Sequence, residues 1–402
     1  MPAWTRRGLF AAGAAVAGRA ALAPRDLLAA TAVPPLPPPL PADVFKERQT
    51  RLRTAAKARG IDAVFVTAST NLAWSANLSI GRSERLTALL LLTDGPAVLI
   101  TPSFEEANHK RNAVVDEVRT WNEDQDPFAL TAKALAGKKT VGIEGSTAYA
   151  TVSALQAAGS AKLEETTSLF DPLRMVKSEQ EQGFIHEAGR RTTATIEATH
   201  KRMRAGMTES EVARILHEEF GNQGVSGWGL VQFGPSSAFP HGGPAERRLA
   251  KGDVVLIDCG GPVRGYSSDV TRTVAFGTAS DELRKVYAIV DKASLAGIGA
   301  LKAGTTGEEA DRAARKVIED AGYGQYFTHR LGHGLGLDVH EQPYLVRGNA
   351  RPLAAGNTVT IEPGIYMPDK FGVRIEDDYA VKDTFPPASL SARPGDLVVV
   401  PA

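Results

Sequence analysis

The chain has 402 residues, 43% of them hydrophobic, which allows more than one buried core and predicts two domains. Its 46 basic and 46 acidic residues cancel, so no net field favours nucleic acid or an anionic membrane, and small partners are expected. The single cysteine, Cys259, excludes an intramolecular disulfide and a cysteine-rich zinc site.

Residues 1–32 have the pattern of a twin-arginine export signal. Arg6-Arg7 precede a weakly apolar, alanine-rich stretch, and small residues before Val33 provide a cleavage site after Ala32. We therefore expect a periplasmic or secreted protein. The alternative is a disordered tail or an organellar presequence in which the Arg-Arg pair is incidental, and without export the protein would be cytoplasmic. No later stretch reaches the roughly 20 apolar residues that span a bilayer, so the mature form is expected outside the membrane.

The next segments predict a linker and a first domain. Residues 33–43 are proline-dense, which favours an extended linker. From residue 44 the pattern predicts a helix that ends at Arg59-Gly60. It then predicts a buried strand in IDAVFVT, and two strands joined by a turn at Asp94-Gly95-Pro96. Helix and strand patterns go on alternating, so residues 44–172 are expected to form a mixed α/β domain.

The second domain is expected over residues 173–402. After Arg174-Met175-Val176-Lys177, the pair Ser178 and Glu181 predicts a capping box and a helix to about Met203. Thr208 starts a second helix by the same chemistry. Strands and glycine-rich turns follow, with helices near 281–301 and 307–321, and all candidate metal ligands lie in this part.

Four carboxylates and one imidazole in this domain are candidate metal ligands. VVLIDCG reads as a strand and GGPVRGYSS turns the chain back, so a hairpin brings Asp258 and Asp269 together. Acids inside apolar strands such as VVLID and VTIE are costly unless something compensates their charge. The five candidates are Asp258, Asp269, His333, Glu362 and Glu376. This oxygen-rich set suits two divalent cations, Mn²⁺ first, with Co²⁺ or Zn²⁺ as alternatives.

Side-chain alternation along the strands places further residues. Cys259 faces away from Asp258 and is expected to be a buried packing residue. Thr271 lies two residues after Asp269 and can hydrogen-bond a ligating carboxylate. In GVRIEDDYAV, Arg374 and Glu376 share a face, so Arg374 is expected beside the metals and within reach of the substrate.

Histidines cluster in HRLGHGLGLDVH, where three of the chain's 8 lie from His329 to His340. The glycines of this segment indicate a tight loop rather than a helix. The motif H-E-x-x-H is absent, which disfavours a mononuclear zinc peptidase. A further histidine, His241, lies in the Pro/Gly-rich segment AFPHGGP.

At these residues the chain resembles the pita-bread metallopeptidases, namely aminopeptidase P, prolidase and, more distantly, methionine aminopeptidase. HRLGHGLG fits the H-x-x-G-H-x-x-G signature of the proline-specific members. The resemblance implies an α+β protein. A C-terminal pita-bread fold, with a curved antiparallel sheet covered by helices, would follow a smaller mixed α/β domain of creatinase type.

The resemblance also implies roles for the candidate residues. Asp258 would hold one metal, Asp269 and Glu376 would bridge both, and His333 and Glu362 would hold the other. His329 would bind substrate near the proline pocket. His241 and His340 would contact the scissile carbonyl and stabilise the oxyanion.

The implied activity is that of a Xaa-Pro aminopeptidase. A metal-bridging hydroxide would attack the N-terminal Xaa-Pro bond, and Glu362 would shuttle the proton. The partner would be a peptide with proline at its second position, and a homodimer is expected. The alternative is a prolidase, which cuts only Xaa-Pro dipeptides. A creatinase-like amidinohydrolase without metals, or a non-catalytic peptide-binding module, is disfavoured because all five ligands are retained.

Overall fold

The computed structural model describes residues 33–243 and 247–402. The proposed export signal, residues 1–32, lies outside the described residues. Residues 33–41 form neither helix nor strand, and Pro41 has the φ of −73° and ψ of 161° of a polyproline II conformation. Among the described helices, none is long and apolar enough to cross a bilayer.

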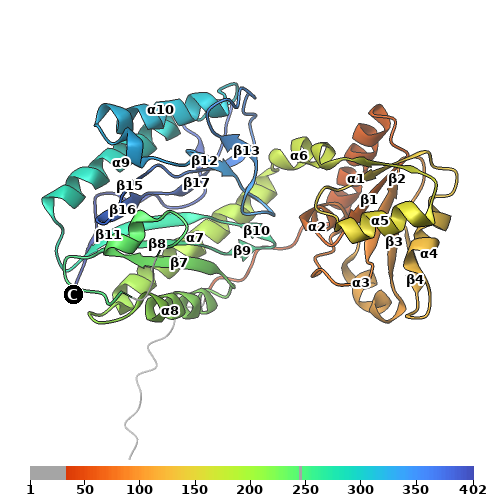
Figure 1. Ribbon diagram of the computed structural model, residues 1–402, viewed down its shortest axis with the longest axis horizontal. Coiled ribbons are helices and arrows are strands. Elements are labelled where there is room, and N and C mark those ends of the chain that lie inside the picture. The colour runs from red at the N-terminus through yellow and green to blue at the C-terminus, as the bar shows by residue number, and fades with distance from the viewer. Residues whose placement is uncertain (1–32, 244–246) are drawn as a thin grey trace, which may run out of the picture. The chain divides into compact units, whose positions relative to one another are not determined.

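The first part of the chain is built on a six-stranded mixed sheet (Figure 1). Its order is β4-β3-β2-β1-β5-β6, and β2 runs antiparallel to its neighbours β1 and β3. The strands are β1 (Ala63–Thr67), β2 (Ala88–Leu92), β3 (Ala97–Pro102), β4 (Glu117–Trp121), β5 (Thr140–Ile143) and β6 (Lys162–Glu165). The predicted hairpin around Asp94 is confirmed as β2 and β3.

Helices cover both faces of this sheet. They are α1 (Ala42–Ala58), α2 (Thr70–Ala76), α3 (Glu106–Asn112), α4 (Pro127–Ala134), α5 (Tyr149–Ala158) and α6 (Thr167–Met175), with a short 3₁₀ helix η1 (Ser103–Glu105). Val64 and Val66 of β1 pack with Leu52 of α1, whereas Phe65 belongs to a separate cluster with Leu155 of α5. Because side chains alternate along a strand, this mixed α/β part has two cores.

The helices α7 (Glu179–Arg202) and α8 (Glu209–Asn222) begin where the sequence predicts. In α7, Ser178 accepts from the backbone of Glu181, whose carboxylate accepts in turn from the Ser178 backbone. Thr208 and Glu211 form the same reciprocal pair at α8. The domain boundary expected between residues 172 and 173 falls inside α6.

A four-stranded sheet of order β19-β11-β8-β7 carries the first candidate ligands. The strands are β7 (Trp228–Phe233), β8 (Val254–Gly260), β11 (Val270–Phe276) and β19 (Val399–Val400). A small hairpin, β9 (Pro262–Val263) and β10 (Tyr266–Ser267), connects β8 to β11, and a 3₁₀ helix η2 (Gly234–Ala238) follows β7. Ile257 and Cys259 pack against Leu216 and Phe220 of α8. Cys259 is therefore a buried packing residue, as predicted.

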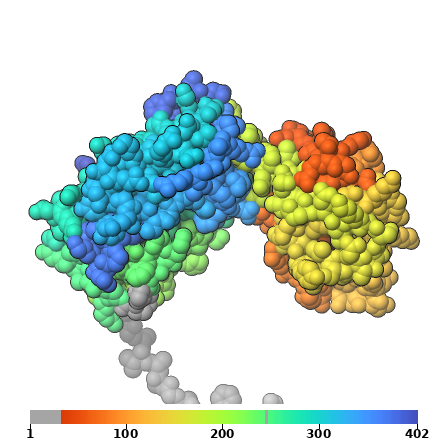
Figure 2. Space-filling model, turned by 45° about the horizontal axis from the view of Figure 1, so that its top comes forward, coloured from red at the N-terminus to blue at the C-terminus, as the bar shows by residue number. Residues whose placement is uncertain are grey.

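A five-stranded sheet of order β13-β12-β14-β17-β18 carries the remaining elements. Its strands are β12 (Gly332–Gly334), β13 (Glu341–Leu345), β14 (Thr358–Ile361), β17 (Asp377–Ala380) and β18 (Ala388–Ser389), and a separate hairpin pairs β15 (Gly364–Met367) with β16 (Phe371–Arg374). Helices α9 (Asp281–Gly299) and α10 (Gly307–Asp320) share a core with β14 to β16, and η3 (Gly324–Tyr326) follows α10. Figure 2 shows α9 and α10, in cyan to light blue, on the face turned to the viewer. The expected α+β class, with curved antiparallel sheets under helices, is confirmed.

Two local predictions need correction. GVRIEDDYAV is not one strand: β16 pairs with β15, β17 pairs with β14, and Glu376 between them bridges to Thr271 of β11. HRLGHGLG is not only a loop, because Gly332 to Gly334 form β12. A Cβ at Gly332 would lie 2.1 Å from the Thr360 carbonyl oxygen, so this close strand approach requires glycine.

Candidate active site

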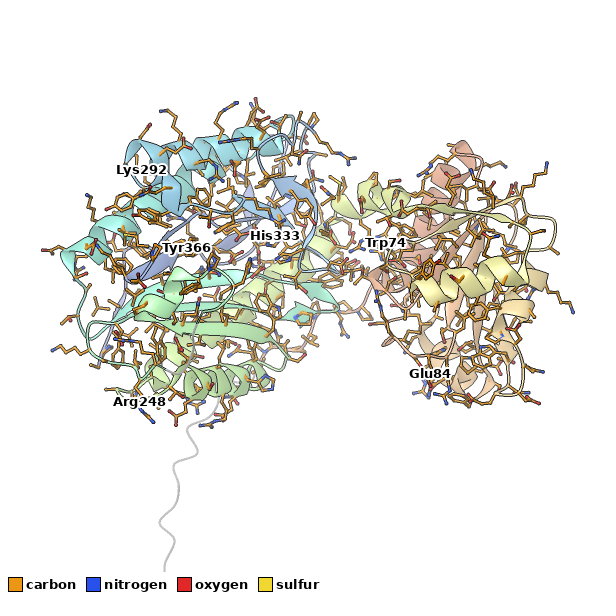
Figure 3. All side chains as sticks on the ribbon, viewed as in Figure 1. Trp74, Glu84, Arg248, Lys292, His333 and Tyr366 are labelled. Atoms are coloured by element: carbon orange, nitrogen blue, oxygen red, sulfur yellow. The ribbon has the colours of Figure 1, made fainter. Side chains whose placement is uncertain are left out.

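The predicted site residues meet at a cleft of about 740 Å³. It is lined by Trp228, Pro240, His241, Asp258, Asp269, His329, Arg330, His333, Val339, His340, Glu362, Arg374 and Glu376. All five candidate ligands, the three histidines given substrate or catalytic roles, and Arg374 are in this set. Thr271 is buried next to it. Figure 3 labels His333 and Tyr366 in the interior of this part.

Strand ends place the ligands. Asp258 lies in β8 directly opposite Thr271 of β11, and Asp269 comes immediately before β11. Glu362 follows the last residue of β14, and His333 is the central residue of β12. Segments far apart in the sequence thus bring their acidic or imidazole side chains to one cleft.

These side chains fit a pair of divalent cations. Three groups have ligand atoms within 4.8 Å of one another: Asp258 with Asp269 and Glu376, His333 with Glu362 and Glu376, and Asp269 with His333 and His340. Among the described residues, neither Asp258 Oδ1 nor Asp269 Oδ1 has a hydrogen-bond partner, although both atoms are buried. Buried oxygens of this kind need a counter-charge.

The orientation of His333 supports the same fit. Its Nδ1–H donates to the Gly334 carbonyl at 3.0 Å, which leaves the lone pair on Nε2. That Nε2 lies 3.3 Å from Glu362 Oε1 and 3.6 Å from Asp269 Oδ2. Burial lowers the pKa of His333 to about 3, and the ring is therefore neutral, as a metal-ligating imidazole must be.

The carboxylates repel one another in the absence of a cation. Burial, reinforced by the charge of Glu376, raises the pKa of Asp269 and the pKa of Glu362 well above their ordinary values. Burial and Asp258 raise the pKa of Glu376 to about 7. Divalent cations would remove this penalty and keep all the acids ionised.

Arg374 and Thr271 contact two of the candidate ligands. The Arg374 side chain, 4% exposed, donates to Asp258 Oδ2 and, over 3.0 Å, to Thr271 Oγ1. Thr271 in turn donates to Glu376 Oε2 at 2.6 Å. Two of the carboxylates are therefore fixed by direct contacts from these two residues.

Sequence reasoning missed Tyr366. Its hydroxyl accepts from Arg374 Nη1 at 2.9 Å and donates to His329 Nε2 at 2.8 Å. His329 Nδ1–H donates to the Arg330 carbonyl at 2.7 Å, so both ring nitrogens of His329 are engaged. Burial and the Arg374 charge lower the pKa of His329 to about 3. Tyr366 lies in an apolar strand, GIYM, whose sequence carries no polar motif.

His340 and His241 lie at the accessible side of the cleft. The His340 ring meets the His333 ring edge-on, with centroids 4.2 Å apart and planes at 79°. Both His340 and His241 are exposed to solvent. Trp228, another residue that sequence reasoning missed, lines the same cleft, is 40% exposed and gives the cleft a large apolar surface.

Family comparisons agree with this arrangement. Residues 183–383 match the metallopeptidase family M24 model, and residues 48–176 match the creatinase/prolidase N-terminal domain model. Together the two matches span most of the described chain.

Individual relatives cover nearly the whole chain. The probable dipeptidase PepE of Mycobacterium tuberculosis is 34% identical over 372 residues, 90% of this chain and 98% of the relative. The Xaa-Pro dipeptidase from Bacillus anthracis has a similar structure, with a TM-score of 0.82, 34% identity, and coverage of 88% and 99% of the two chains. The structure of the X-Pro aminopeptidase from Thermotoga maritima is also similar, with a TM-score of 0.78 and 31% sequence identity. The match covers 86% of this chain and 100% of that chain.

The expected pita-bread fold with a creatinase-type N-terminal domain is thereby confirmed, and M24 peptidases use divalent metals. The chain belongs to metallopeptidase family M24 and is a metallo-exopeptidase.

Proposed function

We propose that the protein hydrolyses the bond between an N-terminal residue and proline, with Xaa-Pro dipeptides as its first substrates and longer Xaa-Pro peptides second. The observation that carries this proposal is the meeting of five candidate ligands and His241, His329 and His340 at one cleft. The names of the relatives move the emphasis from the aminopeptidase predicted from the sequence toward a dipeptidase. Aminopeptidase activity remains the second candidate because of the relative from Thermotoga maritima.

Two divalent ions, with Mn²⁺ as the first choice, would be held by Asp258, Asp269, His333, Glu362 and Glu376. When bound, the ions supply Lewis acidity that activates a water molecule for attack on the peptide carbonyl. Thr271 and Arg374 keep Glu376 and Asp258 aimed at the ions.

Glu362 is the proposed proton carrier. It takes the proton of the attacking water and delivers it to the proline nitrogen as the bond breaks. Thr360 Oγ1 donates to Glu362 Oε1 at 3.3 Å, which orients the carboxylate. His333 Nε2 lies 3.3 Å from the same oxygen.

His241 and His340 are the proposed donors to the oxyanion that forms at the carbonyl. Both face the cleft and are accessible to a substrate. His329 has no free N–H in this arrangement, so we propose that it contributes its ring to the proline pocket, with Arg374 and Tyr366 holding that ring in place.

The deciding experiment compares substrates on purified protein reconstituted with Mn²⁺, Co²⁺ or Zn²⁺. A Xaa-Pro dipeptide, a Xaa-Pro-Yaa tripeptide, a dipeptide without proline and creatine are assayed side by side, and bound metal is measured by elemental analysis. Cleavage of the Xaa-Pro dipeptide alone would indicate a dipeptidase, and cleavage of the Xaa-Pro-Yaa tripeptide would indicate an aminopeptidase. Protein that binds no metal and cleaves none of them would contradict the proposal, and creatine turnover would favour an amidinohydrolase.

The arrangement of the whole protein is proposed as well. We propose an export signal over 1–32, a homodimer, and two domains that meet within α6, near residues 172 and 173. The linker expected over 33–43 ends at residue 41, because α1 begins at Ala42. Light scattering coupled to size exclusion would measure the dimer directly.

A further inference from the structure

The segment Arg174-Met175-Val176-Lys177 has no part in the chemistry described so far, yet its two cations are buried. The side chains of Lys177 and Arg174 are 2% and 9% exposed. Both bind one carboxylate, that of Glu341, which is itself 9% exposed. Lys177 Nζ donates to Oε1, and Arg174 Nη2 donates to Oε2 at 2.6 Å. Arg174 Nη2 also donates to Asp338 Oδ2 at 2.7 Å, so two cations and two acids neutralise one another.

Glu341 connects this ion-pair cluster to the cleft, because it is the first residue of β13 and directly follows His340. His340 is the last residue of the bend that precedes β13, and it lines the cleft of the candidate ligands, whereas Glu341 meets Lys177 and Arg174. Because one peptide bond joins the two residues, the place where the Glu341 carboxylate is held constrains the backbone at His340.

The other side of this contact is rigid. The Lys177 N–H donates to the Gly356 carbonyl at 2.9 Å, and its carbonyl accepts from Gln182 Nε2 at 2.9 Å. The Lys177 side chain also packs on Gly336, where a Cβ would lie 2.8 Å from Lys177 Cε. Gly336 opens the loop that leads from β12 to His340, so Lys177 contacts the loop at its start and at its end.

We propose that Lys177 and Arg174 are positioning residues for His340, which they act on through Glu341. The proposal rests on the catalytic role proposed above for His340. The Glu341 carboxylate binds two buried cations, one through each oxygen, and this fixes its position. If it moved, buried charges would lose their partners, which is energetically costly. Residues in the segment that begins the second domain therefore set the place of an oxyanion donor more than 160 residues later in the chain, since Lys177 and Glu341 are 164 positions apart.

Glu341→Gln is the main test, assayed on the Xaa-Pro dipeptide that the wild type cleaves. The variant keeps the shape of the side chain and removes its charge. We expect kcat to fall about 10- to 100-fold, the loss typical of a catalytic group displaced by about 1 Å, with KM and bound metal nearly unchanged. Lys177→Arg, which retains the cation, should keep most of the wild-type kcat.

A double-mutant cycle with His340→Ala separates positioning from general destabilisation. If Glu341 acts through His340, Glu341→Gln should cost less than about threefold in kcat in the His340→Ala background. The matched control is Glu187→Gln, which removes a carboxylate partner of Arg191, whose side chain is 1% exposed. This control should lower Tm without lowering kcat.

Two outcomes would overturn the inference. One is that Glu341→Gln lowers kcat by the same factor in the wild type and in the His340→Ala background. The other is that the Glu187→Gln control lowers kcat as much as Glu341→Gln does. Should Glu341→Gln not fold, the pair Lys177→Met with Glu341→Gln removes both charges at once and enters the same cycle. A metal-loaded wild type that cleaves no Xaa-Pro substrate would instead contradict the proposed function.

Discussion

Two histidines four residues apart in the same segment have different surroundings. Both His329 and His333 donate from Nδ1 to a backbone carbonyl. The Nε2 of His333 faces two carboxylates, whereas the Nε2 of His329 accepts from Tyr366. Residue type and spacing alone do not separate a candidate metal ligand from a candidate pocket residue. The partner of Nε2 does, and that partner comes from a distant strand.

Glu362 has two proposed roles, as a metal ligand and as the proton carrier, and one substitution separates them. Glu362→Gln retains an oxygen ligand but removes the group that accepts the proton, so kcat should fall at least about 100-fold. Metal content by elemental analysis should fall much less than activity. The exposed Glu179→Gln in α7 is the matched control and should leave kcat unchanged. A Glu362→Gln variant with near wild-type kcat would exclude Glu362 as the proton carrier.

At the scale of elements, close backbone contacts position the ligands. β12 consists of Gly332, His333 and Gly334, and the flanking glycines allow the neighbouring strands to approach. A Cβ at Gly334 would lie 2.2 Å from the Gln342 carbonyl oxygen, and one at Gly332 would lie 2.1 Å from that of Thr360. Backbone atoms in a sheet cannot move aside as a flexible side chain can.

Gly332→Ala is therefore expected to displace β12 and to lower Tm by several degrees, with loss of bound metal because His333 moves. Gly183→Ala is the opposite case, since nothing lies within 4 Å of its Cβ position on the exposed side of α7. It should raise stability by about 0.5–1 kcal/mol. Thermal unfolding and elemental analysis of both variants check the pair. Equal Tm values would contradict the steric argument.

Strand alternation predicted what depends on neighbouring residues in the chain. It placed Thr271 and Arg374 beside the acids and turned Cys259 into the core. It could not predict the break at Glu376, because a tertiary bridge to Thr271 sets that break.

Hydrogen-bond partners that are distant in the sequence could not be predicted either. Tyr366 acts through hydrogen bonds to His329, 37 positions away, and to Arg374. Pairings of this kind depend on which strands become neighbours, and local periodicity does not contain that information.

At the scale of the whole molecule, the buried acids link metal content to stability. In the metal-free protein, burial raises the pKa of Glu376 from 4.5 to about 7, so the folded state binds more protons than the unfolded chain at neutral pH. Its free energy of unfolding should then fall as pH rises through 7. The opposite contribution of His333, whose pKa is lowered by burial from 6.5 to about 3, arises only below pH 6.5.

The metal-free protein should accordingly lose Tm as pH rises from 6.5 to about 8, where the ionisation of Glu376 is complete, whereas the Mn²⁺-loaded protein should not. Thermal scans with and without chelator measure this difference. Glu376→Gln should flatten the metal-free curve. A metal-free protein whose Tm rises over this range would show that the acids are not the cause.

Export is tested on the full chain in cells. Arg6→Lys together with Arg7→Lys should abolish delivery across the membrane if residues 1–32 are a twin-arginine signal. Cell fractionation with immunodetection gives the result. Delivery unchanged by the double substitution would exclude this route.

The candidate ligands are divided between the two larger sheets of the second part of the chain. Asp258 lies in β8 and Asp269 directly before β11 of one sheet, and His333 lies in β12 and Glu362 directly after β14 of the other. Glu376 lies between β16 and β17 and bridges to Thr271 of β11. Bound ions would thus cross-link two sheets that separate chain segments build. Metal loading should slow amide hydrogen exchange in both sheets together, including strands that contribute no ligand, while the six-stranded sheet of residues 63–165 should exchange at the same rate with and without metal.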